Sequence, residues 1–279
     1  MGPQPLSILW VRSRRISRHH LHPTASRAKP ETWVYHARPI PFEPSAQPML
    51  DPAIIDDFIA PPCQGEIRIL YRDHALLLID KPSGLLSLSG KNPQNRDSVH
   101  YRLVQDFPGC TLVHRLDFGT SGLMLVALNK VVNAALCRQF SERTVDKGYL
   151  ALLHGHLVED EGVMDFPIAK DPAQFPLMKI CALAGKPARS RYRVLAREYW
   201  PHDGQSPAPI SRVSLHPESG RTHQLRIHSQ QLGYPMLGCD LYGGVAHALA
   251  GRLMLHAHSL SFNHPLSGER INAICDCPF

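Results

Sequence analysis

The sequence predicts an α+β fold with a mostly antiparallel sheet. Short apolar or alternating segments, which are typical of strands, outnumber helical segments, and no βα alternation runs along the 279 residues. Hydrophobic residues make up 43% of the chain and charged residues 19%, so a large apolar core can form and a wholly disordered or fibrous chain is excluded. No run of about 18 apolar residues occurs, and we therefore expect no transmembrane helix.

The expected elements begin after residue 66. Apolar or alternating side chains predict strands over 67–71, 75–80, 149–153, 189–196, 213–215, 253–256 and 259–262, and a strand, a loop and a second strand over 111–128. Helices are expected over 99–107, where Ser98 can cap the first turn, and over 131–142, which carries an apolar stripe. A third helix is expected over 222–232, closed by Gly233 as its C-terminal cap.

Residues 1–60 form an extension of different composition. They contain nine prolines, and the stretch 12–29 is rich in Arg, Ser and His without an acidic residue. Because no hydrophobic period is sustained there, we expect this extension to be mostly disordered. A mitochondrial transit peptide is a less favoured interpretation, and a translation start at Met49 is a third.

The charge and the cysteine content indicate which partners and which compartment suit the folded part. Residues 1–48 carry seven basic and two acidic residues, so they account for most of the formal net charge of +6. The rest of the chain is nearly neutral, which supports nucleic-acid binding only weakly. The seven cysteines are scattered without a CxxC pair, and we expect a reduced, cytoplasmic protein that is monomeric.

Asp117 is the first candidate for chemistry. It lies in a short polar segment between two apolar strands and precedes the turn-forming residues 119–122. A carboxylate on a loop that leaves a rigid sheet can act as a nucleophile or a base. The alternative is a loop aspartate that only caps nearby backbone N–H groups.

The second candidate is the segment 220–228, Gly-Arg-Thr-His-Gln-Leu-Arg-Ile-His. At helical spacing His223 and Arg226 share one face, and Arg221, Leu225 and His228 share another. An arginine here could fix a carboxylate or a phosphate. A solvated start of an amphipathic helix is the competing interpretation.

Histidines near the C-terminus are the third candidate. His256 and His258 would share one face of a strand, and with Asp240 they could serve a metal-dependent hydrolase. No matched metal-ligand spacing accompanies them, so chance clustering among 17 histidines is the better explanation.

Six segments, in this order, resemble the RluA family of RNA pseudouridine synthases. They are Leu-Leu-Ile-Asp-Lys-Pro-Ser-Gly-Leu-Leu at 77–86, His-Arg-Leu-Asp-Phe-Gly-Thr-Ser-Gly-Leu at 114–123, Lys-Gly-Tyr-Leu-Ala at 147–151, the segment 220–228, Leu-Gly-Cys-Asp-Leu-Tyr at 237–242 and Arg-Leu-Met-Leu-His-Ala at 252–257. The resemblance covers residues 66–279. It implies the pseudouridine synthase fold, with an active-site cleft across a mixed, mostly antiparallel sheet that helices and loops flank, and a catalytic domain over 61–279 without an S4-type domain.

The resemblance also implies a reaction and a site. Family members isomerise uridine to pseudouridine in RNA without a cofactor or a metal, and the related enzymes act on 23S rRNA and the tRNA anticodon stem-loop. Asp117 matches the catalytic aspartate, as either nucleophile or base. Tyr149 matches the tyrosine that lies against uracil, and Arg221 matches the arginine that pairs with the aspartate. Leu225 corresponds to the pocket wall.

The resemblance implies roles at further positions. His114 and Arg115 are expected to contact RNA, and Arg115 would fill the gap left by the flipped base. Lys81 and Pro82 match a motif that we interpret as structural support. Cys239 stands between Gly238 and Asp240, which the family normally has adjacent, so it puts target choice in doubt. A catalytically silent RNA-binding or ribosome-assembly factor, and a synthase for another RNA, are the remaining alternatives.

Overall fold

The computed structural model describes residues 58–201 and 206–279, together with the backbone of strand β1 (Trp33–Tyr35). β1 pairs antiparallel with β2 and lies at one edge of the main sheet, a position that the sequence did not predict. Apart from β1 and residues 58–60, the predicted disorder of residues 1–60 lies outside the described residues.

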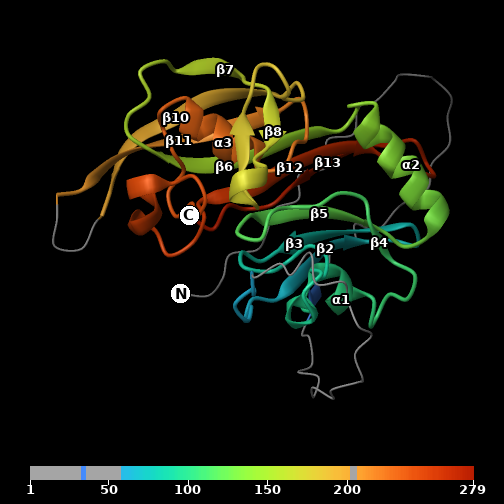
Figure 1. Ribbon diagram of the computed structural model, residues 1–279. Coiled ribbons are helices and arrows are strands. Elements are labelled where there is room, and N and C mark those ends of the chain that lie inside the picture. The colour runs from blue at the N-terminus through green and yellow to red at the C-terminus, as the bar shows by residue number, and fades with distance from the viewer. Residues whose placement is uncertain (1–32, 36–57, 202–205) are drawn as a thin grey trace, which may run out of the picture.

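One mixed sheet of eleven strands forms the body of the protein (Figure 1). The strands that follow β1 are β2 (Ile67–Arg72), β3 (Leu76–Lys81), β4 (Thr111–Leu112), β5 (Ser121–Ala127), β6 (Asp146–His154), β7 (Glu161–Asp165), β10 (Arg189–Trp200), β11 (Ala208–Pro217), β12 (Leu255–Asn263) and β13 (Arg270–Ile274). Their order is β1-β2-β3-β5-β12-β6-β11-β10-β7, with β4 paired to β5 and β13 paired to β12. The described pairs are antiparallel except β5–β12, which confirms the predicted fold class.

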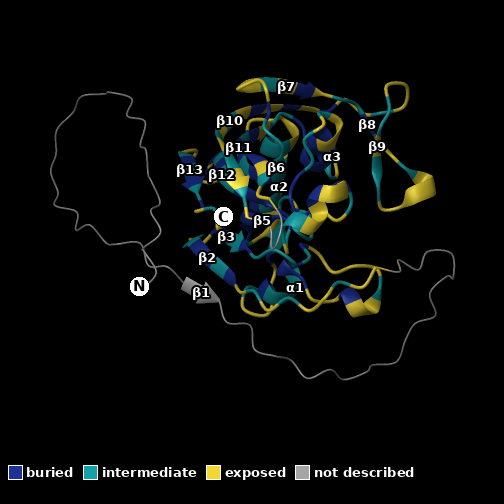
Figure 2. Ribbon diagram, turned by 90° about the vertical axis from the view of Figure 1, so that its left-hand side faces the viewer, coloured by how far each residue is buried: buried dark blue, intermediate teal, exposed yellow. Residues whose placement is uncertain are grey.

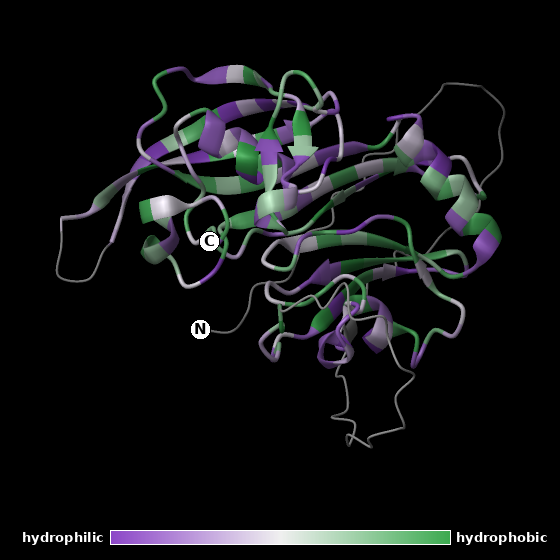
Figure 3. Ribbon diagram, in the orientation of Figure 1, coloured by the Kyte–Doolittle hydropathy of each residue, from purple (hydrophilic) through white to green (hydrophobic). Residues whose placement is uncertain are grey.

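Among the described residues, three α-helices accompany the sheet, namely α1 (Val99–Leu103), α2 (Lys130–Ser141) and α3 (Gln224–Gln231). The Ser98 side chain accepts from the Tyr101 N–H at 3.1 Å and caps α1 as predicted, although the helix is shorter than expected. Around α2, hydrophobic and hydrophilic residues alternate, and Val132 and Leu136 are buried (Figure 3). No helix in the described part of the chain is long and apolar enough to cross a membrane.

The core has two main parts that meet at β12 and β6. One lies around β2, β3 and β5, and the other lies between β6, β11 and α3. Tyr149 on β6 packs against both clusters. The buried strands occupy the centre of the molecule, whereas the small sheet of β8 (Ile168–Lys170) and β9 (Met178–Ile180) projects from it (Figure 2).

The strand β12 lies between β5 and β6, where the two parts of the core meet, and it differs from the predicted strands. The sequence indicates two strands over 253–262, but the structure has one strand with a bulge between Ala257 and Ser259. Its parallel partner β5 carries Gly122 at φ +108°, where a Cβ would come within 2.3 Å of the Ala257 carbonyl oxygen. Glycine is therefore required at the point where the two halves are paired.

Candidate active site

Asp117 lies on the loop between β4 and β5, as the sequence predicts, and faces a pocket at the junction of the two cores. Its backbone carbonyl accepts from the Thr120 N–H at 3.1 Å, which closes a turn directly before β5. The Asp117 side chain is 21% exposed. A carboxylate in this position is held by the sheet and is still open to a ligand.

The loop that carries Asp117 is fixed by the segment 81–87. The Gly84 N–H and the Lys81 Nζ both donate to the Phe118 carbonyl, at 2.9 and 3.2 Å. The Ser83 hydroxyl donates to the Gly119 carbonyl and the Ser87 hydroxyl to the Leu116 carbonyl, each at 2.7 Å. The backbone is thus anchored on both sides of the carboxylate, which limits the positions that Asp117 can take.

Lys81 is the centre of this anchor. Its side chain is fully buried, and the ammonium group donates to the carbonyls of Pro82, Leu85 and Phe118. Burial lowers the pKa of Lys81 to about 7, although Cys63 and Asp117 oppose that shift. These contacts support our interpretation of Lys81 as structural support for the catalytic loop.

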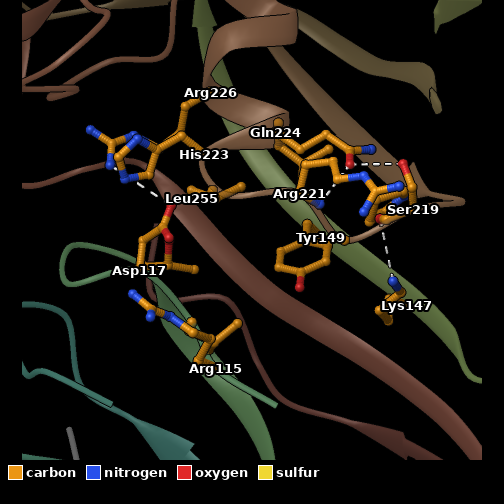
Figure 4. A pocket seen from close by; sticks show the side chains of 15 residues that line it. Arg115, Asp117, Lys147, Tyr149, Ser219, Arg221, His223, Gln224, Arg226 and Leu255 are labelled. Atoms are coloured by element: carbon orange, nitrogen blue, oxygen red, sulfur yellow. Dashed lines mark hydrogen bonds and ion pairs between the residues drawn. The ribbon is translucent and has the colours of Figure 1, made fainter. Parts of the chain in front are cut away.

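Arg226, rather than Arg221, pairs with Asp117. The Arg226 Nη1 lies 3.8 Å from the Asp117 Oδ2, and Figure 4 shows the two side chains facing each other. The Arg221 Nε instead donates to the Pro187 carbonyl at 3.2 Å, and its side chain lies beside Ser219. The predicted Arg221–Asp117 pair is therefore wrong.

The backbone at His223 explains this correction. His223 has φ +55°, in the left-handed region, and α3 begins only at Gln224. Arg221 therefore lies before the helix and does not share a helical face with Leu225 and His228, which the spacing of the motif predicts. Arg226 sits in the first turn of α3, and its side chain points toward the Asp117 loop.

Four groups surround the Arg226 guanidinium. Besides Asp117, the Nη2 contacts the Asp240 Oδ1, the Nε lies 3.3 Å from the Cys239 Sγ, and the Tyr242 ring lies under the guanidinium at 5.4 Å. The Arg226 side chain is only 5% exposed. Burial opposes its charge, but Cys239, Asp117 and Asp240 together raise the pKa of Arg226, so it stays positive.

The pocket beside Asp117 combines an aromatic floor with apolar walls and a cationic rim. Tyr149, Leu225 and Leu255 supply the apolar part, and Arg115, Lys147 and Arg221 also line it. Burial, and then the charge of Asp117, raises the pKa of Tyr149 well above its usual range, so its hydroxyl stays protonated. The pocket has a volume of about 110 Å³.

Comparison with known proteins decides the family. The family described as RNA pseudouridylate synthase matches residues 75–231, which include Asp117, Tyr149 and Arg226. The dual-specificity RNA pseudouridine synthase RluA of Yersinia pestis is 43% identical over 212 residues, covering 76% of this chain and 99% of that protein. The chain belongs to the RluA family of RNA pseudouridine synthases. Members of this family are isomerases.

Further relatives agree with this assignment. The Escherichia coli (strain K12) dual-specificity RNA pseudouridine synthase RluA is 42% identical over 210 residues, covering 75% of this chain and 92% of that protein. The solved structure of human RNA pseudouridylate synthase domain containing 1 matches with a TM-score of 0.63 and 33% identity, covering 76% of this chain and 83% of that one. The pseudouridine synthase fold expected from the sequence is confirmed.

The role predicted for His114 is not supported by its position. The Leu125 N–H donates to the His114 Nε2 at 3.0 Å, and the imidazole stacks on Phe140 at 4.8 Å. Burial, and then Lys147, lowers the pKa of His114 to about 4, so the ring is neutral at physiological pH. His114 therefore fixes the catalytic loop to β5 and α2, and its contact with RNA stays a prediction. Arg115 is exposed and lines the pocket, as an RNA contact requires.

Gln224 is a site residue that the sequence analysis missed. Its Oε1 accepts from the Ser219 hydroxyl at 2.8 Å and from the Arg221 N–H at 2.9 Å. Its Nε2 donates to the Arg189 carbonyl and the Ser190 hydroxyl. Gln224 thereby joins the turn before α3 to β10, and its place inside the motif at 220–228 is the sequence signal of that role.

The metal interpretation of His256, His258 and Asp240 finds no shared site. The His256 Nδ1 lies 2.9 Å from the Ser121 Oγ, and the His258 Nδ1 lies 2.7 Å from the Cys275 carbonyl oxygen. Asp240 contacts Arg226 instead. Across residues 58–201 and 206–279, no group of three or more His, Cys, Asp or Glu side chains is arranged to hold a metal ion.

Proposed function

We propose that this protein isomerises uridine to pseudouridine in 23S rRNA, in the tRNA anticodon stem-loop, or in both, with Asp117 as its catalytic carboxylate. The observation that carries the proposal is the pairing of Asp117 with the buried Arg226 at a pocket floored by Tyr149. The names of the relatives, which are RNA pseudouridine synthases of dual specificity, support the substrate class.

The number of carboxylates in the pocket fits this reaction. The N-glycosidic bond of uridine breaks, the uracil turns, and its C5 is joined to the ribose C1′. Hydrolytic glycosidases use two carboxylates, one to protonate the leaving group and one to activate water or attack the sugar. Among the described residues that line the pocket, Asp117 is the single carboxylate. Uracil is a stabilised leaving group that must be retained, so a site without a second carboxylate suits its rearrangement better than its hydrolysis.

Three further pocket residues have roles in the proposal. Arg226 pairs with the Asp117 carboxylate and directs it toward the ribose. The protonated Tyr149 and the side chain of Leu225 form the surface on which the uracil ring packs. The volume of about 110 Å³ is small beside the 300–1,000 Å³ typical of pockets for drug-sized ligands, which suits a single base.

The cations at the rim suit the rest of the nucleotide. A target uridine in a folded loop must leave its stack, at a cost of a few kcal/mol. The exposed guanidinium of Arg115 can stack where the base was, and Lys147 and Arg221 can contact phosphates. Burial, and then Arg143, lowers the pKa of Lys147, and a phosphate at this position would favour its charged form.

We also propose that the enzyme acts as a monomer in the cytoplasm. All seven cysteines are free thiols, as in a protein of a reducing compartment.

The test is release of tritium from RNA labelled at uridine C5, with 23S rRNA and tRNA transcripts as separate substrates and EDTA present. C5 loses its hydrogen only when it is joined to the sugar. Release from either RNA, insensitive to EDTA, supports the proposal and assigns the target. Tight RNA binding without release from either RNA or from total cellular RNA would favour the catalytically silent factor. Release only from total RNA would indicate a different target.

A further inference from the structure

Arg226 also contacts a second carboxylate, that of Asp240, which does not line the pocket. The Arg226 Nη2 contacts the Asp240 Oδ1 more closely than the Nη1 approaches Asp117, which is 3.8 Å away. Resting on the function proposed above, we propose that Asp240 is a positioning residue, which holds the Arg226 guanidinium so that its free edge faces Asp117.

The geometry of the guanidinium makes this possible. A guanidinium is planar and presents five N–H donors in a fixed fork. The Nε and Nη2 edge of Arg226 is occupied by Cys239 and Asp240, and its face by the Tyr242 ring. With that edge fixed, Nη1 is the nitrogen left to face Asp117. A rotation about the side-chain torsions would break the outer contacts and the inner one together.

Asp240 is the strongest of the outer contacts. Cys239 offers a thiol, which is a weak acceptor, whereas Asp240 offers a carboxylate oxygen. The Tyr242 ring is itself fixed, since its hydroxyl accepts from the Met178 N–H at 2.8 Å and lies 2.9 Å from the His223 Nδ1. The loop 238–242 is therefore a rigid support on which Asp240 supplies the charge.

The distance between the Arg226 Nη1 and the Asp117 Oδ2 indicates what the contact with Asp240 does. At 3.8 Å the pair is looser than a direct charge-assisted hydrogen bond, which is about 2.7–2.9 Å long. Asp240 draws the guanidinium away from Asp117 and prevents a tight bidentate pair. Asp117 is then oriented, yet one of its oxygens remains available to the substrate.

Position in the sequence agrees with this role. Asp240 follows Cys239, which is fully buried against Arg226, and Gly238 has φ +66° with its backbone beside the Arg252 carbonyl. A Cβ on Gly238 would lie 1.8 Å from that oxygen, so only glycine fits at the start of this loop. The cysteine that departs from the family pattern thus serves the support of Arg226.

The experiment measures single-turnover pseudouridine formation by wild type, Asp240→Asn, Arg226→Lys and the double variant. We expect Asp240→Asn to lower the rate at saturating RNA at least ten-fold and to change the half-saturating RNA concentration less than two-fold. In the Arg226→Lys background the same change should cost less than two-fold more, because Asp240 acts through Arg226. Equal losses in both backgrounds, or full activity of Asp240→Asn, would overturn the proposal.

Two further comparisons keep the result interpretable. Asp160→Asn removes another exposed carboxylate, which pairs with Arg197 at 2.8 Å, and should leave the rate unchanged. Asp240→Glu and Asp240→Gln match in size and differ in charge, so Asp240→Glu should be the more active even if Asp240→Asn folds poorly. Equal activity of these two would refute a charged anchor. An inactive wild type would instead refute the proposed function.

Discussion

Two polar clusters lie on opposite faces of the central strands, and they differ in what their side chains leave free. In the cleft, Asp117 is 21% exposed and its cationic partner is 3.8 Å away. On the other face, His256 is 1% exposed and contacts Ser121, and the Arg252 Nη2 donates to the same hydroxyl at 2.6 Å. The register places His256 there, because its neighbour Ala257 pairs with Tyr149.

The comparison shows how a functional site differs from a polar cluster that only stabilises the fold. Both clusters contain arginine and histidine, and the sequence singles out both. The cluster of His256, Ser121 and Arg252, the rear cluster, has its polar groups paired with one another and with the backbone. The second nitrogen of His256 lies 3.3 Å from the Cys275 carbonyl oxygen, and the Ser121 hydroxyl contacts both His256 and Arg252. In the cleft, the Asp117 carboxylate faces a cavity and can accept further hydrogen bonds. We therefore expect changes in the cleft to affect turnover and changes at the rear to affect stability.

The largest effect should follow Asp117→Asn. This change removes the charge and keeps the shape, so pseudouridine formation should fall by at least about 10³-fold, the loss typical of an essential catalytic group. RNA binding should stay within a few-fold of wild type. Tritium release and filter binding on the same preparation measure both, and preserved turnover would remove Asp117 from the chemistry.

At the rear cluster, His256→Ala should destabilise the protein by about 2–3 kcal/mol, because it leaves a cavity and the buried Ser121 without one partner. The rate per folded molecule should not change. His247→Ala, at an exposed position, is the matched control and should change stability by less than about 0.5 kcal/mol. Urea unfolding at pH 7 checks both, and lost turnover in folded His256→Ala would abolish the distinction between the clusters.

Stability should also fall in mild acid. Burial, the largest cause, lowers the pKa of His256 to about 4, and the pKa of His114 likewise. In the unfolded chain a histidine takes up a proton as pH falls through about 6.5, whereas in the folded state these two stay neutral to about pH 4. Their contribution is complete above pH 6.5 and is lost between 6.5 and 4.

That loss is measurable by comparing two pH values. Each histidine should lower the free energy of unfolding by about 2 kcal/mol between pH 7 and pH 5. In His256→Ala the decrease over this interval should be smaller than in wild type by that amount. An identical pH dependence in the two proteins would contradict the neutral, buried state of His256.

Removal of residues 1–48 should have the smallest effect. Of the described residues this deletion takes away only β1, which pairs with β2 at the edge of the sheet, far in strand order from the β6 that carries Tyr149. We expect turnover within two-fold of wild type. An insoluble or inactive truncated protein would show that the extension contributes to the fold.

Much of the fold was predictable because its central strands contain apolar runs or alternating apolar residues. The strands β2, β3, β5 and β6 and the helix α2 lie within a few residues of the predicted ranges. The missed strands are β1, β7, β8, β9 and β13, which have at most five residues, and their ends depend on their pairing partners. The bulge at Ala257/Ser259 hid the continuity of β12.

The site was predictable in its segments and less so in its individual side chains. The motif at 220–228 contains two arginines, and which one reaches Asp117 depends on where the helix begins. The left-handed backbone at His223 sets that point, and no residue type in the motif announces it. The acceptor nitrogen of His114 is used by the Leu125 N–H, a contact that the motif at 114–123 does not reveal.

The most direct test of the account compares Arg226→Gln with Arg221→Gln in single-turnover pseudouridine formation. Both changes remove one guanidinium from the same motif, and only Arg226 contacts Asp117 among the described contacts of these two arginines. We predict a loss of at least 100-fold for Arg226→Gln and less than five-fold for Arg221→Gln. The reverse order, or equal losses, would contradict the assignment of Arg226 as the partner of the catalytic carboxylate.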